Sequence, residues 1–275
     1  GLDVTYFRNR DYNNLVKIPV ANSSGYNFYL MNGNTFVRTG LEIMATATPM
    51  RSNDFRWDVM VNFSKYKRVL QEIYNDAPEL NRIKPGERMD RIFGDVYERD
   101  PSGNIVYESN GFPKRDPYKR FIGNADPDWT YGMENTLRYK QFTLRFLVDG
   151  RIGGLIYSTT NAKMWWGGTH PGTVNSFRDD ANAGKNTYVG PGVVVSSGGI
   201  QYDADGNVVS DDRKFAPNTK AVNYIDYMIN TSNDANTNNN YYSQTFLKLR
   251  EVNFTWQVPG RREELPGSPP PPRGR

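Results

Sequence analysis

Few residues of this chain have side chains that could carry out catalysis. His170 is the only histidine, and there is no cysteine. A Ser-His-Asp triad could in principle use His170, but no Gly-x-Ser-x-Gly turn appears, and Ser196-Ser197-Gly198-Gly199 lacks that spacing. A zinc site is excluded in practice, because one histidine cannot supply the usual ligand set. We therefore interpret His170 as a structural loop residue and predict no catalytic, metal-binding or cofactor-binding residue.

Acidic residues form two further patterns. Residues 203–207 (Asp-Ala-Asp-Gly-Asn) imitate the start of a calcium loop, but the position that needs a bidentate glutamate holds Lys214. A hairpin turn is the better interpretation of this stretch. The pairs Asp179-Asp180 and Asp211-Asp212 resemble the two carboxylates of glycosidases. Adjacent loop residues point apart, however, so we interpret them as solvated turn residues and predict that the chain is not an enzyme.

Trp165 and Trp166 are the most suggestive neighbours in the longest loop. Aromatic faces stack on sugar rings, so this pair could contact a substrate at an entrance. The alternative, which we favour, is that both indoles pack the loop onto its neighbours. They remain the candidate substrate-contacting residues.

Composition narrows the class of protein. The net charge of +4 comes from 34 basic and 30 acidic residues that are well mixed, which disfavours a nucleic-acid partner. Aromatics make up 13% of the chain, too many for a disordered segment. No run of 18 apolar residues predicts a membrane-spanning helix, but a barrel strand needs only about 9–11 alternating residues. The chain starts directly in strand-like sequence without a signal peptide, so we expect it to begin inside a fold.

Alternation of apolar and polar residues is the dominant pattern and predicts strands. Short and long connections follow one another along the chain, as in an outer-membrane barrel with tight inner turns and long outer loops. The long connections are 11–35, 70–128 and 158–244. The predicted strands are 1–10, 36–48, 54–69, 129–139, 141–157 and 245–258. The fold class is therefore all-β, with about six antiparallel up-and-down transmembrane strands of a partial β-barrel and long extracellular loops.

Each predicted strand has one apolar and one polar face. In a barrel, the polar residues would line the lumen or contact a plug. Tryptophans near strand ends (Trp57, Trp129 and Trp256) fit the interfacial girdle. Turn signals at 100–104 and 203–207 predict hairpins, so we expect structured loops. The candidate lumen-facing residues are Arg38, Glu42, Arg56, Asp58, Arg138 and Arg145.

Several segments, in chain order, resemble the C-terminal barrel of SusC/RagA-type TonB-dependent transporters. The similarity extends from residue 1 to about residue 259. The segments are Gly1–Phe7 (GLDVTYF), Asn34–Glu42 (NTFVRTGLE), Phe55–Trp57 (FRW), Ile122–Trp129 (IGNADPDW), Tyr139–Leu144 (YKQFTL), Asp149–Gly154 (DGRIGG) and Phe246–Val252 (FLKLREV).

This resemblance implies a plugged barrel of roughly 22 strands, of which this chain supplies about six late ones. It implies active import of an oligosaccharide or a peptide across the outer membrane of a Gram-negative bacterium. The implied partners are a SusD-like surface lipoprotein, the TonB complex and outer-membrane lipid, with no nucleic acid and no cofactor. The TonB complex would act through an N-terminal part that this chain lacks, together with the plug.

We divide the chain into residues 1–259, the barrel segment, and residues 260–275, a tail with a proline run that departs from the family. Truncation or a frame change near residue 260 is our hypothesis for the tail. Sequencing the DNA across this junction tests it. Two other classes stay open: a soluble secreted β-sandwich that binds carbohydrate, and a β-rich glycoside hydrolase.

Overall fold

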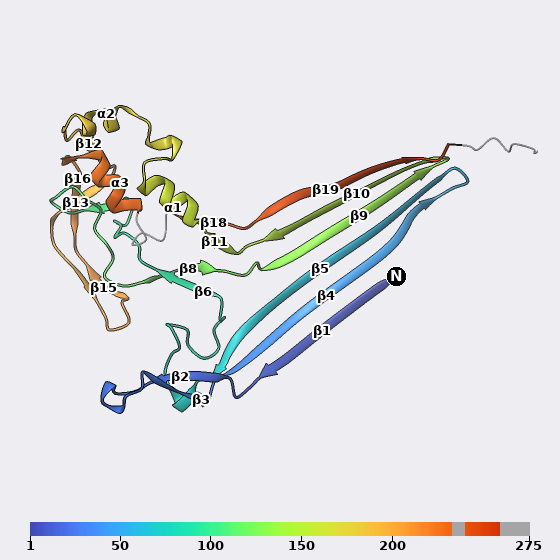
Figure 1. Cartoon of the computed structure of the whole chain (residues 1–275), viewed down its shortest axis with the longest axis horizontal. Helices are drawn as coiled ribbons and strands as arrows, with labels where there is room; N and C mark the ends of the chain where they lie inside the picture. The colour runs from blue at the N-terminus through green and yellow to red at the C-terminus, as the bar shows by residue number, and fades with distance from the viewer. Residues whose placement is uncertain (233–239, 259–275) are drawn as a thin grey trace, which may run out of the picture.

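A long antiparallel sheet dominates the molecule (Figure 1). The computed structural model describes residues 1–232 and 240–258. The predicted tail, 260–275, lies outside these residues. The sheet has six strands in the order β1-β4-β5-β9-β10-β19, so neighbours in the sheet are also successive long strands in the chain. They are β1 (Leu2–Asp11), β4 (Thr35–Arg51), β5 (Phe55–Glu72), β9 (Trp129–Tyr139), β10 (Phe142–Ile152) and β19 (Phe246–Trp256).

The up-and-down order predicted from the connections is confirmed. Two connections are tight: residues 52–54 join β4 to β5, and Lys140-Gln141 joins β9 to β10. Lys140 takes a positive φ of 51°, as a two-residue hairpin turn requires. The sheet is open among the described residues, because β1 and β19 each pair along one edge only.

One predicted strand, 141–157, is wrong in its extent. The chain leaves the sheet after Ile152, at Gly153 and Gly154, which have φ values of 78° and 80°. This left-handed conformation cannot continue a strand, and glycine adopts it most easily. The residues beyond it, Leu155–Tyr157, form β11, which pairs with β18 (Tyr241–Ser243) instead.

The long loops gather at one end of the sheet, opposite the tight turns (Figure 1). They fold into small sheets and short helices, so the structured loops predicted from the turn signals are confirmed. The remaining strands are β2 (Leu15–Pro19), β3 (Phe28–Asn32), β6 (Arg91–Gly94), β7 (Val106–Tyr107), β8 (Arg120–Asn124), β12 (Tyr188–Val189), β13 (Val193–Ser197), β14 (Ile200–Tyr202), β15 (Val208–Asp211), β16 (Lys214–Pro217) and β17 (Ala221–Val222).

Strands predominate, as the all-β prediction expects, and short helices that it did not include occur in the loops. They begin at capping residues: the side chains of Ser158 and Asn175 accept the backbone N–H of Asn161 and Arg178, respectively. Among the described residues no helix has the length and apolar character to cross a membrane. The helices are α1 (Thr159–Trp166), α2 (Ser176–Asn182) and α3 (Tyr224–Ser232), with 3-10 turns η1 (Asn22–Ser24), η2 (Tyr74–Asp76) and η3 (Pro171–Thr173).

A small apolar core lies where the sheet meets the loops. Phe36 from β4 and Leu70 from β5 pack with Ile83 of the following loop, and Leu70 is fully buried. Met89 and Phe93 extend this cluster. The outer ends of β4 and β5 are therefore packed against protein, unlike the rest of the sheet.

Candidate functional site

The strand register gathers all six candidate lumen residues on one face of the sheet. Within this face, Arg56 of β5 lies directly opposite Arg138 of β9 in the strand register. Asp58 pairs with Thr136, which in turn pairs with Arg145 of β10. The residues on this face are Arg38, Glu42, Arg56, Asp58, Arg138 and Arg145.

Charges on this polar face are largely arranged in pairs. Arg56 lies 2.8 Å from Asp58, which also accepts a 2.7 Å hydrogen bond from Thr48. Arg145 contacts Glu134 at 2.9 Å through two hydrogen bonds. Such half-exposed pairs add little stability but keep the surface hydrated. The face can therefore border water.

The opposite face is apolar and uncovered. Val61, Met133 and Phe254 on it are 39%, 38% and 66% exposed. Aromatic rings cluster at both ends: Trp129 packs on Phe63 and Tyr131 at the loop end, with centroids 5.7 and 5.3 Å away. At the turn end, the rings are Phe142, Tyr139, Trp57 and Trp256.

Two long loops, 73–128 and the described part of 153–245 (153–232 and 240–245), fold onto each other, and we call them together the loop assembly. Val106 of the first pairs with Val193 of the second in a short parallel bridge between β7 and β13. Nearby, the hydroxyls of Tyr107 and Tyr227 share a 2.9 Å hydrogen bond. Strands from both loops thus form a single small sheet, β16-β13-β7.

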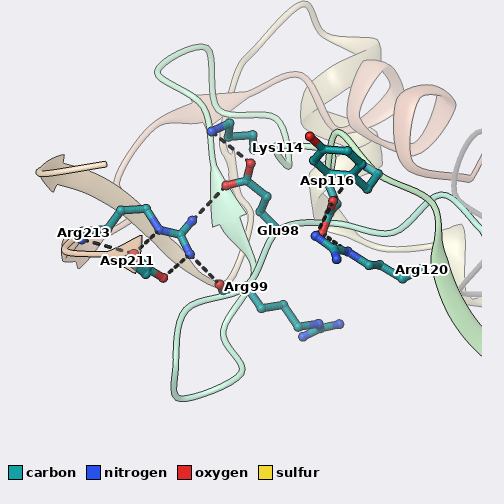
Figure 2. A network of polar contacts seen from close by, with 8 residues as sticks. Glu98, Arg99, Lys114, Asp116, Arg120, Asp211 and Arg213 are labelled. Atoms are coloured by element: carbon teal, nitrogen blue, oxygen red, sulfur yellow. Dashed lines mark hydrogen bonds and ion pairs between the residues drawn. The ribbon is translucent and has the colours of Figure 1, made fainter. Parts of the chain in front are cut away.

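A buried ion pair reinforces this joint (Figure 2). Arg213 lies 2.9 Å from Glu98, and the two side chains are only 4% and 3% exposed. Lys114 approaches the other oxygen of Glu98 at 3.1 Å. Arg213 also binds Asp211 at 2.8 Å, and this hydrogen bond holds the pKa of the Asp211 carboxyl below its usual value. The Asp211 carboxylate is thereby kept ionised against Arg213.

Arg120 makes a second link between the two loops. It binds Asp116 of its own loop at 2.7 Å and donates to the backbone oxygen of Gly206 in the other. Gly206 belongs to the turn at 203–207, in which Asp203 accepts the backbone N–H of Asp205 and Asn207. The hairpin predicted there is confirmed as β14 and β15. The Asp203 carboxylate therefore accepts hydrogen bonds from within its own turn.

The loop assembly contains a half-open cavity of about 520 Å³ between α1, α3 and the first loop, which we call the aromatic cavity. Its wall combines rings with carboxamides. Tyr188 packs edge-on against Tyr224 at 5.1 Å and against Phe177 at 5.2 Å. The carboxamides come from Asn161, Asn175 and Asn240.

The structure separates the two candidate substrate-contacting tryptophans. Trp165 lines the aromatic cavity and also an adjoining one of about 280 Å³, whereas Trp166 lines only the smaller. His170 stacks on Trp165 at 4.2 Å, and its Nδ1 accepts the N–H of Gly172. This agrees with the structural role predicted for His170. Within residues 1–232 and 240–258, no three His, Cys, Asp or Glu side chains are grouped to hold a metal ion.

Sequence reasoning missed the cavity's carboxamides and tyrosines. Asn161, Asn240 and Tyr224 lie far apart in the chain, and none belongs to a motif with fixed spacing. The only available signal was the richness of the 158–244 connection in asparagine and tyrosine. That signal is equally typical of turns.

Comparisons with known proteins give two sequence relatives. One is TonB-dependent receptor P3 of Formosa agariphila, 25% identical over 66% of this chain and 22% of that protein. The other is TonB-dependent receptor SusC of Bacteroides thetaiotaomicron, 21% identical over 57% of this chain and 18% of that protein. No family model matches the chain.

The fold is also similar to a solved structure of the RagAB peptide importer in its closed-closed state. The TM-score is 0.53 at 11% identity, covering 94% of this chain and 27% of that chain. This chain spans about a fifth of the length of its curated relatives. The resemblance predicted from the sequence is confirmed, and the chain is related to the SusC/RagA-type TonB-dependent transporters.

Proposed function

We propose that this chain forms late strands of an outer-membrane β-barrel that imports a bulky nutrient in a TonB-dependent manner. The observation that carries the proposal is the exposed apolar face, bordered by aromatic rings at both ends. In a soluble β-sandwich such a face would be covered by a second sheet. The hydrocarbon of a lipid bilayer is the environment that matches an exposed apolar face with aromatic borders.

The dimensions of the sheet support this environment. Strand β9 has 11 residues and carries Trp129 and Tyr139 at its ends. At about 3.3 Å per residue it is roughly 36 Å long, and a tilt of roughly 45° reduces this to about 25 Å across the membrane. That matches the apolar band of outer-membrane barrels, which is flanked by aromatic girdles. Trp57, Trp129 and Trp256 would belong to these girdles.

The polar face, with Arg56, Asp58 and Arg145, would then line a water-filled lumen or contact a plug. The free edges of β1 and β19 need partners, because unpaired backbone groups are not tolerated in hydrocarbon. We propose that other strands of a longer protein close the barrel, and that its plug lies outside residues 1–259.

The relatives guide the rest of the proposal. The cargo would be an oligosaccharide or a peptide, captured by the loop assembly beneath a SusD-like surface lipoprotein. Energy would come from the TonB complex, acting through a part of the longer protein outside this chain. The protein would reside in the outer membrane of a Gram-negative bacterium and catalyse no reaction.

Fractionation combined with uptake tests this function. We expect the full-length protein to sediment with outer membranes, to require detergent for extraction, and to co-purify with a surface lipoprotein. Uptake of a fluorescent oligosaccharide or peptide should stop when either this protein or TonB is deleted. A strain lacking a different TonB-dependent receptor is the control.

Recovery of the full-length protein in the detergent-free soluble fraction would contradict the proposal and favour the secreted carbohydrate-binding sandwich. Uptake that persists without TonB would contradict its active mechanism.

A further inference from the structure

Three cations continue the apolar face of the sheet beyond its aromatic border at the loop end. Strand alternation places Lys65 and Lys67 of β5 on the same face as Phe63. Arg8 of β1 joins them, because Arg8 and Lys67 both lie opposite Thr39 of β4 in the strand register. All three charged side chains are exposed. We call Arg8, Lys65 and Lys67 the basic patch.

The basic patch has no carboxylate partner among residues 1–232 and 240–258. No ion pair or side-chain hydrogen bond engages any of its three cations there. The acidic residues at the outer ends of the same strands are already engaged. Glu72 is bound by Arg10 at 3.0 Å and by Thr35 at 2.7 Å, and Asp11 lies 3.7 Å from Arg68. The charge of the patch is therefore available to an anion from outside the chain.

The patch lies where lipid headgroups begin in the proposed membrane orientation. Phe63, Trp129 and Tyr131 border the apolar band at the loop end. Lys65 is two residues beyond Phe63 on β5 and Lys67 is four, which corresponds to about 7 and 13 Å along the strand. Long basic side chains can keep their methylene groups on apolar surface while their charges reach the polar interface.

The position of the cations is local and not a general feature of the outer rim. On the same face, the outer ends of β9, β10 and β19 carry Trp129, Gly150, Ile152 and Leu247 and no cation. A general need for charge at the interface would place cations on these strands as well. Clustering on β1 and β5 instead favours one discrete anionic group.

We propose that the basic patch binds the phosphate of an anionic lipid in the outer leaflet of the outer membrane. The acyl chains of that lipid lie along the apolar face below the patch, where Val4 and Tyr6 are 55% and 69% exposed. A free phosphate or an acidic protein would use the charges but leave this apolar surface uncovered. The inference rests on the proposed function, because it needs a bilayer against this face.

Native mass spectrometry of the detergent-purified full-length protein tests the patch. The probes are monophosphoryl lipid A, the same lipid with its phosphate removed, and inorganic phosphate as a competitor. We expect the phosphorylated lipid to remain bound and the dephosphorylated lipid to bind much more weakly. Inorganic phosphate at the concentration of the lipid should not displace it, since it gains nothing from the apolar surface.

The triple variant Arg8→Gln, Lys65→Gln, Lys67→Gln should lose affinity for monophosphoryl lipid A on the order of 100-fold, because each cation near an anionic lipid contributes about fivefold. The charge-conserving triple variant Arg8→Lys, Lys65→Arg, Lys67→Arg should retain most of the affinity. Because all three side chains are exposed, these substitutions should leave the fold intact. Heat-modifiability on gels checks this.

Arg115→Gln, Lys119→Gln, Lys214→Gln is the matched control. It also removes one arginine and two lysines, all of them exposed, but these residues lie in the loop assembly. This variant should bind the phosphorylated lipid like the wild type.

The inference is overturned if the patch variant binds monophosphoryl lipid A like the wild type, if removal of the phosphate has no effect, or if inorganic phosphate displaces the lipid at equal concentration. These outcomes leave membrane location and TonB dependence untouched, so a failure of the basic patch is distinguishable from a failure of the proposed function. Recovery of the full-length protein in the detergent-free soluble fraction would refute both.

Discussion

At the scale of single residues, Glu98 and Arg213 connect the two long loops through a pair that is almost fully buried. Breaking a buried pair strands the remaining charge, which costs more than the pair contributes. We predict that Glu98→Gln destabilises the joint by about 3 kcal/mol, or roughly 100-fold in hydrogen-exchange protection. Exchange of the Val106 amide, which donates to the backbone oxygen of Glu98, is the measurement.

Lys185→Met is the control, because the pair of Lys185 with Asp180 is 63% and 33% exposed. Because exposed pairs contribute little to stability, Lys185→Met should leave the protection of the Val106 amide unchanged. Equal protection of Val106 in the wild type and in Glu98→Gln would contradict the role assigned to the pair.

From the sequence, the direction of a side chain could be predicted only within strands, where successive residues point to opposite faces. The six charged residues predicted on one face of the strands do share that face, because alternation fixes it. Trp165 and Trp166 could not be distinguished, since they lie in an unpredicted helix, α1. The hydrogen bond from Asn161 to Asn240 could not be predicted, because the two residues lie far apart in the sequence.

At the scale of elements, the strands were predictable and the helices were not. Each long strand carries a period-2 pattern, and the tight turns between them are short. The helices have only seven to nine residues, too few turns for a clear 3.6-residue period. Their capping residues, such as Ser158 and Asn175, are equally common in turns.

The break after β10 is the clearest difference between sequence and structure, and it yields a prediction. A Cβ at Gly154 would lie 3.0 Å from the backbone nitrogen of Pro127 and 3.1 Å from the oxygen of Ala125. Backbone atoms cannot give way cheaply, so Gly154→Ala adds crowding to the strain of its φ of 80°. We expect Gly154→Ala to destabilise the junction by about 2–3 kcal/mol.

Gly184→Ala isolates the strain component, because Gly184 has a φ of 77° and open space around its Cβ position. It should cost about 1 kcal/mol. Faster exchange of the Asp128 amide, which donates to the oxygen of Ile152, reports the junction. If the two variants lowered the thermal midpoint equally and Asp128 exchanged normally, crowding at Gly154 would be refuted.

At the scale of the whole molecule, the sheet has one polar and one apolar face, and the two faces need different surroundings. Its polar face carries paired charges such as Arg145 and Glu134, and its apolar face leaves Phe254 exposed. The sequence predicted these two faces, but it could not predict closure, because none of the strands in residues 1–232 and 240–258 pairs with the outer edge of β1 or β19. The loops lie together at one end of the sheet, as the proposed capture from one side of a membrane requires (Figure 1).

Spin labels on the two faces of the full-length protein in liposomes test this claim most directly. Labels at Val59, Leu144 and Phe254 should collide often with oxygen, which concentrates in hydrocarbon, and rarely with a water-soluble nickel chelate. Labels at Thr136, Arg145 and Asn253, on the polar face, should show the reverse preference. If the first three labels were shielded from both reagents, or favoured the nickel chelate, the apolar face would contact protein or water and the barrel account would be wrong.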